Sequence, residues 1–319
     1  MTFLEGLGVE QPVVQAGMGG GVSRHELAVA VSEAGGLGTI AVNGADAIRR
    51  EVAAAKARTD RPVAVNVLLP LAHRSWFEAA AGADVVVTFW GRPVRRTPRP
   101  WIHQVGSVDE ARAARAAGAD AVIVQGVEAG GHVRGTTPGA DLLERVRVAL
   151  PAGFPLLLAG GVATREDVED ALAAGAEAAV AGTRFLLSEE SRAHPLYKER
   201  LLAADRTVLT DLFGFGWPGA HRVVPNEATE RHLGPAGEVP RVHRVLNRMS
   251  ALGTKHVPTS LEQRLVARQR PGGRLLTPQT ATDDRPASLV AAGALYAGET
   301  VRRIHDVLPA GEIVASLSG

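Results

Sequence analysis

The feature that most constrains this chain is an alternation, repeated up to about residue 190, of short apolar runs with alanine-rich stretches of helical spacing. Most of the runs are continuously apolar, which is typical of parallel strands that are buried on both faces. The runs predict eight strands, over residues 12–16, 37–42, 63–69, 85–89, 101–105, 121–125, 155–159 and 178–181. Eight strands with helices between them predict an α/β fold, a closed (β/α)8 TIM barrel rather than an open sheet.

The segments between the strands carry the end signals of helices. Helical spacing predicts helices over residues 26–34, 45–57, 71–80, 108–117, 142–149 and 165–174. We expect side-chain N-caps at Ser23, Ser107 and Thr164. We expect left-handed glycines at the helix ends at Gly35, Gly82, Gly118 and Gly175. The proline-rich link between the fourth and fifth strands has no room for a crossover helix, so that helix is predicted to be missing or reduced to a turn.

Beyond Ser191 the pattern changes, because proline, glycine and charged residues become frequent and the helical stretches are separated by long connections. We expect residues 1–190 with 284–319 to form the barrel. Residues 191–283 are then an irregular, mainly helical appendage near the active-site mouth. The stretch 289–307 is predicted to be a helix that packs back on the barrel.

Composition excludes several classes of protein. The chain has no cysteine, which excludes a disulfide scaffold, a thiolate metal site and a cysteine nucleophile. Its 35 basic and 34 acidic residues give no reason to expect nucleic acid or an anionic membrane as a partner. The ten histidines show no metal-ligand spacing, so no metal site is expected. With neither a signal peptide nor an apolar run of about 18 residues, a soluble, cytoplasmic protein is predicted.

The functional residues of such a barrel lie at the carboxyl ends of its strands. Gly160 and Gly161 follow the seventh strand, and Ala181, Gly182 and Thr183 end the eighth. Backbone N–H groups at these two ends predict a phosphate site, although paired glycines also occur in ordinary tight turns.

Two strands contain an amide among apolar residues, Asn66 in the third and Gln125 in the sixth. A buried amide without partners costs roughly 1–3 kcal/mol. Each is therefore either a satisfied amide of the barrel interior or a ligand for a flat heterocycle with donors and acceptors along its edge.

His132 follows Gly130 and Gly131 after the sixth strand. A histidine in such a loop is either structural or, at the barrel mouth, a candidate for proton transfer, since its ordinary pKa is about 6.5. His103, His221, His243 and His256 show no partner pattern and are taken as structural.

Together these segments resemble the nitronate monooxygenase family, formerly called 2-nitropropane dioxygenases. The resemblance lies in residues 15–23, 65–67, 125–132, 159–162 and 181–185, with a weaker echo in 295–301. The run Gln-Gly-Val-Glu-Ala-Gly-Gly-His over residues 125–132 is the most specific part.

The resemblance implies an FMN-dependent oxidoreductase that oxidises alkyl nitronates with O2 to a carbonyl compound and nitrite. It implies that Asn66, Gln125, Gly130, Gly131, Gly160, Gly161, Ala181, Gly182 and Thr183 hold FMN, with the backbone of Gly17 and Met18 against the isoalloxazine. His132 would be the catalytic residue, as a base for a neutral nitroalkane or as a donor that orients the nitro group.

Relatives with the same Gly-Gly-His run include NAD(P)H-dependent FMN reductases that act on quinones or on enoyl thioesters of acyl carrier protein. A flavin-binding protein without turnover is a third reading. The short link holds Arg92, Arg95, Arg96 and Arg99, near the expected substrate entrance. These arginines form either a solvated basic loop or a clamp for a carboxylate-bearing nitronate. The oligomeric state, monomer or homodimer, stays open.

Overall fold

The computed structural model describes residues 1–234, 237–251, 266 and 268–319. The chain divides into two compact units, a larger one of residues 1–129, 134–192 and 306–319 and a smaller one of residues 130–133 and 193–305. Residues 284–305, which the sequence assigned to the barrel, group with the smaller unit, as does the short segment 130–133 that contains His132.

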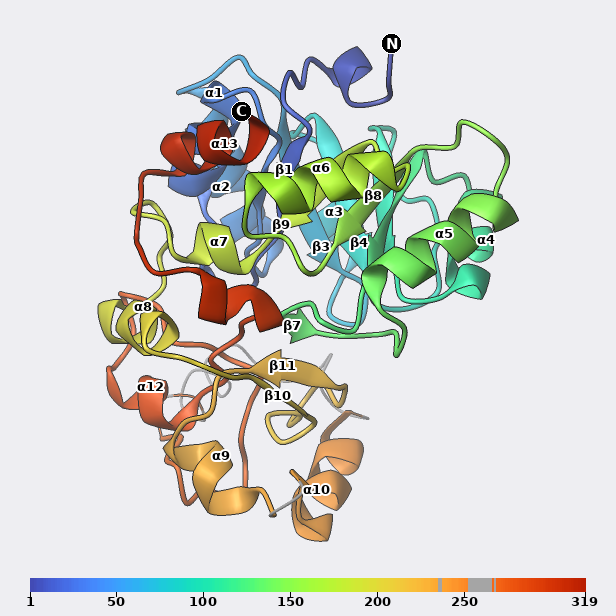
Figure 1. The fold of residues 1–319 in the computed structure, drawn as a ribbon. Coiled ribbons are helices and arrows are strands. Elements are labelled where there is room, and N and C mark those ends of the chain that lie inside the picture. The colour runs from blue at the N-terminus through green and yellow to red at the C-terminus, as the bar shows by residue number, and fades with distance from the viewer. Residues whose placement is uncertain (235–236, 252–265, 267) are drawn as a thin grey trace. The chain divides into compact units, whose positions relative to one another are not determined.

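The larger unit is built on eight parallel strands (Figure 1). They are β1 (Val13–Gln15), β2 (Gly38–Ile40), β3 (Val63–Leu68), β4 (Val85–Phe89), β5 (Trp101–Val105), β6 (Ala121–Gln125), β8 (Leu156–Ala159) and β9 (Ala178–Ala181). The sheet order is β1-β9-β8-β6-β5-β4-β3-β2, and a parallel bridge between Val14 and Leu37 joins its two ends. The predicted strands and the predicted barrel are confirmed.

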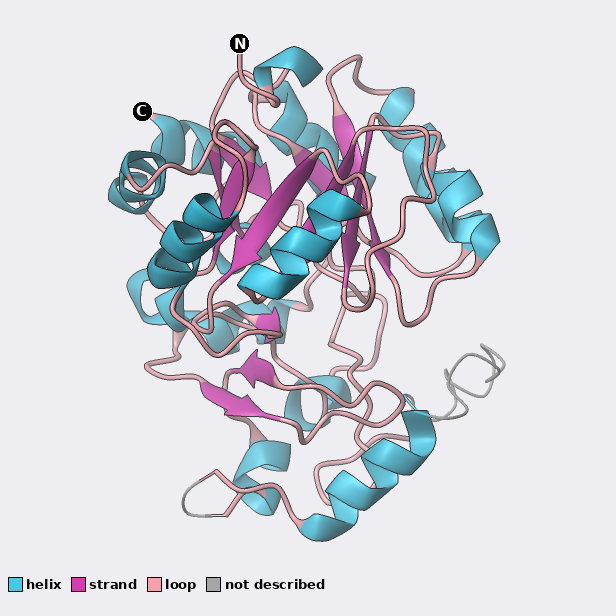
Figure 2. Cartoon of the chain, turned by 90° about the vertical axis from the view of Figure 1, so that its right-hand side faces the viewer, coloured by secondary structure: helices cyan, strands magenta, loops and turns pink. Residues whose placement is uncertain are grey.

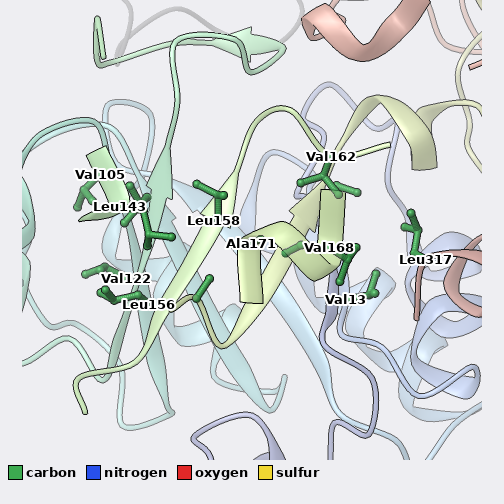
Figure 3. Close-up of a cluster of buried hydrophobic side chains, with 14 of the residues drawn as sticks. Val13, Val105, Val122, Leu143, Leu156, Leu158, Val162, Val168, Ala171 and Leu317 are labelled. Atoms are coloured by element: carbon green, nitrogen blue, oxygen red, sulfur yellow. The ribbon is translucent and has the colours of Figure 1, made fainter. Parts of the chain in front are cut away.

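Alternate residues of the strands face two different environments, as the period of a strand requires. One set from all eight strand regions packs together as the barrel interior, including Ala64, Val87 and Ile123. The other set, including Val122 and Leu156, packs against the surrounding helices (Figure 3).

Helices flank the strands of the larger unit (Figure 2). They are α1 (His25–Glu33), α2 (Ala45–Lys56), α3 (Arg74–Ala80), α4 (Val108–Ala116), α5 (Gly139–Ala149), α6 (Arg165–Ala173), the short α7 (Thr183–Leu186) and α13 (Ala310–Ser318). The six predicted barrel helices are confirmed. Residues 90–100, all of which are described, contain no helix, as predicted for the link between β4 and β5. Across the described ranges, no helix has the length and apolarity to cross a lipid bilayer.

Two of the predicted N-caps are confirmed. The Ser107 hydroxyl accepts a hydrogen bond from the Glu110 N–H at 3.2 Å, and Thr164 forms a capping box with Asp167. Ser23 is not a cap, because α1 starts from Arg24. The hydroxyl of Ser23 instead accepts from the Met18 N–H at 3.0 Å, which closes the glycine-rich loop after β1.

Three of the four predicted left-handed glycines are confirmed, with φ of 89° at Gly35, 88° at Gly118 and 95° at Gly175. Gly82 is not among the residues with positive φ, so that prediction is wrong. The end of α3 is closed in another way, since the Gly82 N–H donates to the Ala79 carbonyl at 3.3 Å.

The smaller unit combines short helices with a three-stranded antiparallel sheet of order β10-β11-β7. Its elements are β7 (Gly131–His132), α8 (Pro195–Leu202), β10 (Val208–Thr210), β11 (His221–Val223), α9 (Glu227–His232), α10 (Arg241–Ala251), α12 (Ser288–Ala292) and the 3-10 helix η3 (Glu299–Arg303). The sequence did not predict this sheet, because strands of two or three residues leave no measurable alternation.

The predicted helix over residues 289–307 is wrong. The chain is helical only as far as α12, leaves the helix at Gly293 with φ of −97° and ψ of 173°, and becomes helical again as η3 after Gly298. Glycine is a weak helix former, and two glycines five residues apart interrupt the ladder. The helix that packs into the core of the larger unit is α13, through Ile313, Val314 and Leu317.

Candidate active site

Two buried amides lie at the carboxyl ends of barrel strands. Asn66 is two residues beyond the interior residue Ala64, and Gln125 is two residues beyond the interior residue Ile123. Because side chains of a strand alternate, both amides belong to the interior-facing set. Asn66 is 8% and Gln125 3% exposed, and the Gln125 Oε1 accepts from the Arg134 N–H at 3.4 Å. The larger unit therefore has a polar layer above its apolar interior.

The loop after β1 approaches this layer closely. A Cβ atom placed on Gly17 would lie 2.5 Å from the Cβ of Asn66, so any side chain at position 17 would collide with Asn66. The next residue, Met18, is held by Ser23 as described above. The structure thus brings Gly17 against Asn66, and Met18 follows in the same loop.

The ends of β8, β9 and β1 are neighbours in the sheet. Gly160 and Gly161 have φ of 104° and 79°, which favours glycine at both positions. Gly182 precedes the first turn of α7, and a Cβ there would lie 3.7 Å from the Cβ of Ala16. The Ala16 N–H donates to the Ala181 carbonyl at 2.9 Å, so residues 181–183 lie beside the loop after β1. The backbone groups predicted for phosphate binding therefore come from adjacent strand ends.

Glu128 belongs to the most specific part of the resemblance, but no role was predicted for it. Its two carboxylate oxygens accept from the Gly139 N–H at 3.0 and 3.2 Å, at the first residue of α5. A Cβ on Gly126 would lie 2.2 Å from Glu128 Oε1, and a Cβ on Gly160 would lie 3.1 Å from it. Gly126 and Gly160 thus leave room for the Glu128 carboxylate, which caps α5. A glycine at position 160 is therefore explained by packing, apart from any phosphate binding.

A third amide, Gln104, shares the interior face at the barrel mouth. It pairs with Phe89 on one side and with the interior residue Ile123 on the other, and its side chain is partly exposed. It was not predicted as a site residue, because residues 101–105 have the pattern of an apolar strand. Its spacing could have indicated it, because Gln104 lies two residues beyond Ile102 and so shares the face of the strand that Ile102 occupies.

His132 lies in the smaller unit, in β7, directly opposite His221 of β11. Its ring is stacked on the indole of Trp217, with 3.7 Å between ring centroids and 9° between ring planes. His221 and Tyr296 approach it in tilted geometry, at 5.3 and 5.7 Å. The sequence had left His221 as a structural residue and had not considered Trp217 or Tyr296.

The glycines before His132 are required by the backbone around them. A Cβ on Gly130 would lie 2.5 Å from the Gly298 nitrogen and 2.6 Å from the Ala297 carbonyl carbon. Gly131 has a φ of 75°. The weaker sequence echo at residues 295–301 is therefore the segment against which Gly130 packs.

Burial decides the charge of these histidines. It lowers the pKa of His132 well below the ordinary 6.5, and the neighbouring His221 acts in the same direction. Burial also lowers the pKa of His221 to about 4. Both rings are therefore uncharged near neutral pH, and an uncharged imidazole can accept a proton or donate one hydrogen bond.

Tyr296 is likewise uncharged. Burial raises its pKa well above 10, and its hydroxyl donates to the Pro278 carbonyl at 2.7 Å. The rings that surround His132 in the smaller unit are thus aromatic and without formal charge.

Of the other histidines taken as structural, the two that the structure describes do not join this cluster. His103 is buried in the larger unit, with its Nδ1 2.7 Å from the Thr88 hydroxyl, and burial lowers its pKa to about 4. His243 is buried on α10 with its ring 4.5 Å from that of His232. His256 lies outside the described residues.

The expectation that the arginines of the short link lie at the substrate entrance is wrong for Arg95 and Arg99. Arg95 pairs with Asp120 at 3.1 Å, and the Arg99 Nε donates to the Ala81 carbonyl at 2.8 Å. Asp120 and Ala81 precede β6 and β4, at the amino-terminal end of the barrel. The link runs from one end of the barrel to the other, and these two side chains fasten it there.

A different arginine, Arg134, lies on the carboxyl side. Its guanidinium carbon is 4.9 Å from the ring centre of Trp90, and it pairs with Glu110. Trp90 has a φ of 67°, in the left-handed region where bulky residues are rare, directly after β4.

One group of side chains in the larger unit has the ligand types of a metal site. The ligand atoms of His25, Glu26 and Glu51 lie within 4.8 Å of one another. The His25 Nδ1 is 2.7 Å from Glu51 Oε2, and Glu26 also approaches Arg192 at 3.6 Å. These contacts link the three side chains to one another and to Arg192 by hydrogen bonding and charge.

Comparison with known proteins identifies the family. A family model described as nitronate monooxygenase matches residues 2–86 and 100–319. The chain belongs to the nitronate monooxygenase family. The unmatched stretch between the two segments contains the shortened link between β4 and β5.

Relatives within and near the family support this membership. A nitronate monooxygenase of Pseudomonas aeruginosa is 33% identical, over 65% of this chain and 76% of the relative. A (3aS,4S,5R,7aS)-5-hydroxy-7a-methyl-1-oxo-octahydro-1H-indene-4-carboxyl-CoA dehydrogenase of Mycobacterium tuberculosis is 35% identical, over 70% and 66% of the two chains. The solved structure of a nitroalkane oxidase from Streptomyces ansochromogenes is 30% identical with a TM-score of 0.75, covering 98% and 96%.

Like other nitronate monooxygenase family members, the chain is a flavin-dependent oxidoreductase with a TIM barrel. Of its predicted site residues, Gly17, Met18, Asn66, Gln125, Gly160, Gly161, Ala181, Gly182 and Thr183 lie in the larger unit. Gly130, Gly131 and His132 lie in the smaller unit. The ligand roles of these residues remain predictions.

Proposed function

We propose that this chain oxidises alkyl nitronates with O2 to a carbonyl compound and nitrite, with FMN as cofactor. The observation that supports this most is the pair of buried amides, Asn66 and Gln125, in the polar layer at the carboxyl ends of the barrel strands. Amides in this position suit a heterocycle whose edge carries both donors and acceptors.

The residues present fit FMN. Asn66 and Gln125 would bind the polar edge of the ring, and the backbone at Gly17 and Met18 would lie against its face. The N–H groups at Gly161, Gly182 and Thr183 would hold the phosphate. FMN supplies the electron acceptor in such an enzyme, while the protein binds and orients.

His132 acts on the substrate. Its uncharged ring accepts a proton from the carbon next to the nitro group of a neutral nitroalkane. A nitronate is already an anion and needs no base, so with it the ring donates a hydrogen bond that orients the nitro oxygens. Trp217 and Tyr296 supply an apolar wall around the ring and exclude water from it.

The proposal is tested by oxygen uptake of the purified protein with a panel of nitronates, with and without NADH. We expect a flavin absorbance spectrum, O2 uptake and nitrite release without NADH. Gln125→Leu should weaken FMN binding, whereas Thr136→Ala, a change at an exposed residue, serves as the control. No uptake with any nitronate, in protein that holds FMN, would contradict the proposal.

A second candidate function is NAD(P)H-dependent reduction of a thioester or a quinone. The relative from Mycobacterium tuberculosis is named for a CoA thioester substrate. The smaller unit has a pocket of about 450 Å³ lined by Arg244, Arg248 and the buried Asn247. Arginine guanidinium groups suit the phosphates of CoA or of a nicotinamide nucleotide.

Anaerobic mixing with NADH or NADPH separates the two functions. Rapid bleaching of the flavin, with a quinone or an enoyl thioester as the second substrate, would favour the reductase. Bleaching by a nitronate alone would favour nitronate oxidation. An Arg248→Ala variant should weaken the reductase reaction and leave nitronate oxidation unchanged.

A further inference from the structure

The indole of Trp217 is the flat partner of the His132 ring. The two rings lie 3.7 Å apart and 9° from parallel, whereas His221 and Tyr296 are tilted by 54° and 47°. Both His132 and Trp217 are buried, with exposed fractions of 8% and 9%. Among the described neighbours of His132, Trp217 is therefore the residue whose ring lies nearly parallel to the imidazole.

The segment that carries Trp217 is itself fixed. The Trp217 N–H donates to the Gly214 carbonyl at 3.1 Å, and the Gly216 N–H donates to the Ser250 hydroxyl of α10 at 2.8 Å. A Cβ on Gly214 would lie 2.8 Å from the Asn247 amide nitrogen. The turn is thus tied to α10, and these contacts fix the backbone from which the indole projects.

We infer that Trp217 is the positioning residue of His132: its indole fixes the plane of the imidazole and shields one ring face from water. The inference deepens the proposed function and rests on it only for the part that His132 plays in proton transfer. No other residue of the described chain stacks on His132 in parallel.

The charged and titratable groups around His132 indicate how removal of the Trp217 indole would change its pKa. His221 and Tyr296 face it as titratable groups and are uncharged near neutral pH, for the reasons given above. Arg222 of β11 is in register with Gly131 and pairs with Glu299 at 3.0 Å. Burial is the first cause that lowers the pKa of His132, whereas a hydrogen bond with the backbone of Trp217, which a change of the side chain leaves in place, acts in the opposite direction. Opening one ring face to water should therefore raise that pKa.

The first test follows the protonation of His132 by NMR in FMN-loaded, full-length protein with ¹³C-labelled histidine, assigned with a His132→Gln variant. In the natural chain we expect His132 to titrate well below the ordinary pKa of a histidine. In Trp217→Ala its pKa should rise toward that ordinary value, and Trp217→Phe, which keeps an aromatic face, should restore the natural behaviour. An unchanged titration in Trp217→Ala would overturn the inference.

The second test is kinetic. With a neutral nitroalkane, Trp217→Ala should lower kcat by roughly tenfold and change KM by less than about twofold, since orientation and proton transfer are lost rather than binding. Its rate should also fall at acidic pH where that of the natural chain stays level. Trp76→Ala, which removes an indole from α3 of the larger unit, is the matched control and should change neither value. Equal losses in Trp217→Ala and Trp217→Phe would contradict a role for the stack.

The two tests separate this inference from the proposed function. If the natural chain binds FMN but shows no turnover with nitro compounds, the proposed function fails. The NMR titration would still decide the role of Trp217.

Discussion

At the scale of single residues, the site depends on places where a side chain is missing. Gly17 makes room for Asn66, and Gly130 makes room for the backbone at Gly298. A sequence shows such glycines but not the atoms they accommodate, because those atoms come from distant parts of the chain.

Gly130→Ala should destabilise the smaller unit by about 2 kcal/mol, because the added methyl would lie 2.5 Å from the Gly298 nitrogen and the backbone would have to move. Urea denaturation measures the change. Gly6→Ala is the control, since the nearest atom to its added Cβ would be 3.9 Å away. Equal stabilities of the two variants would show that the backbone around Gly298 moves to accommodate the methyl group at no cost in free energy.

The arginines of the short link should act on stability and not on substrate. Arg95→Met removes a half-exposed ion pair with Asp120 and should cost at most about 1 kcal/mol of unfolding free energy. Its KM for a carboxylate-bearing nitronate should equal that of the natural chain. A tenfold increase in KM would contradict this prediction and indicate that Arg95 binds the substrate.

Strand-end reasoning predicted Asn66, Gln125 and the region of His132, because a barrel places function at the carboxyl ends of its strands. It could not predict Trp217 or Tyr296. Their proximity to His132 depends on tertiary pairing across many residues, and no local periodicity records it.

At the scale of elements, the prediction succeeded where an element has its own signals and failed where it has none. The barrel strands are continuous apolar runs, and helices such as α6 start at a cap that can be read from the sequence. The strands β10 and β11 are too short for a period, and the glycines at 293 and 298 outweighed the helical spacing of residues 289–307.

Thr164→Ala should destabilise the larger unit by about 1 kcal/mol, because the capping box at the start of α6 would lose its hydroxyl. Thermal or urea denaturation measures the effect, with the exposed Thr136→Ala as the matched control. An unchanged midpoint would mean that water or the Asp167 carboxylate replaces the lost hydrogen bond in full.

At the scale of the whole molecule, buried histidines in both units couple folding to pH. Burial lowers the pKa of His103 and His221 to about 4, and that of His132 well below 6.5. The unfolded chain therefore binds more protons than the folded one between about pH 6.5 and pH 4, and the folded state loses stability as pH falls through this window.

Lowering the pH from 7 to 5 should reduce the free energy of unfolding by about 2 kcal/mol for His103 alone. Urea denaturation at the two pH values measures the change. His103→Gln should lessen the dependence, and His73→Gln, at an exposed position, should leave it unchanged. A stability that rises on acidification would contradict the assigned burial.

The larger unit is interrupted in sequence, since residues 193–305 lie between its main part and α13. On the ribosome, the barrel strands emerge long before Ile313, Val314 and Leu317, which fill part of their outer core. Until then the faces of α1 and α6 that receive α13 stay exposed. This part of the outer core can therefore close only after the whole inserted unit has been synthesised.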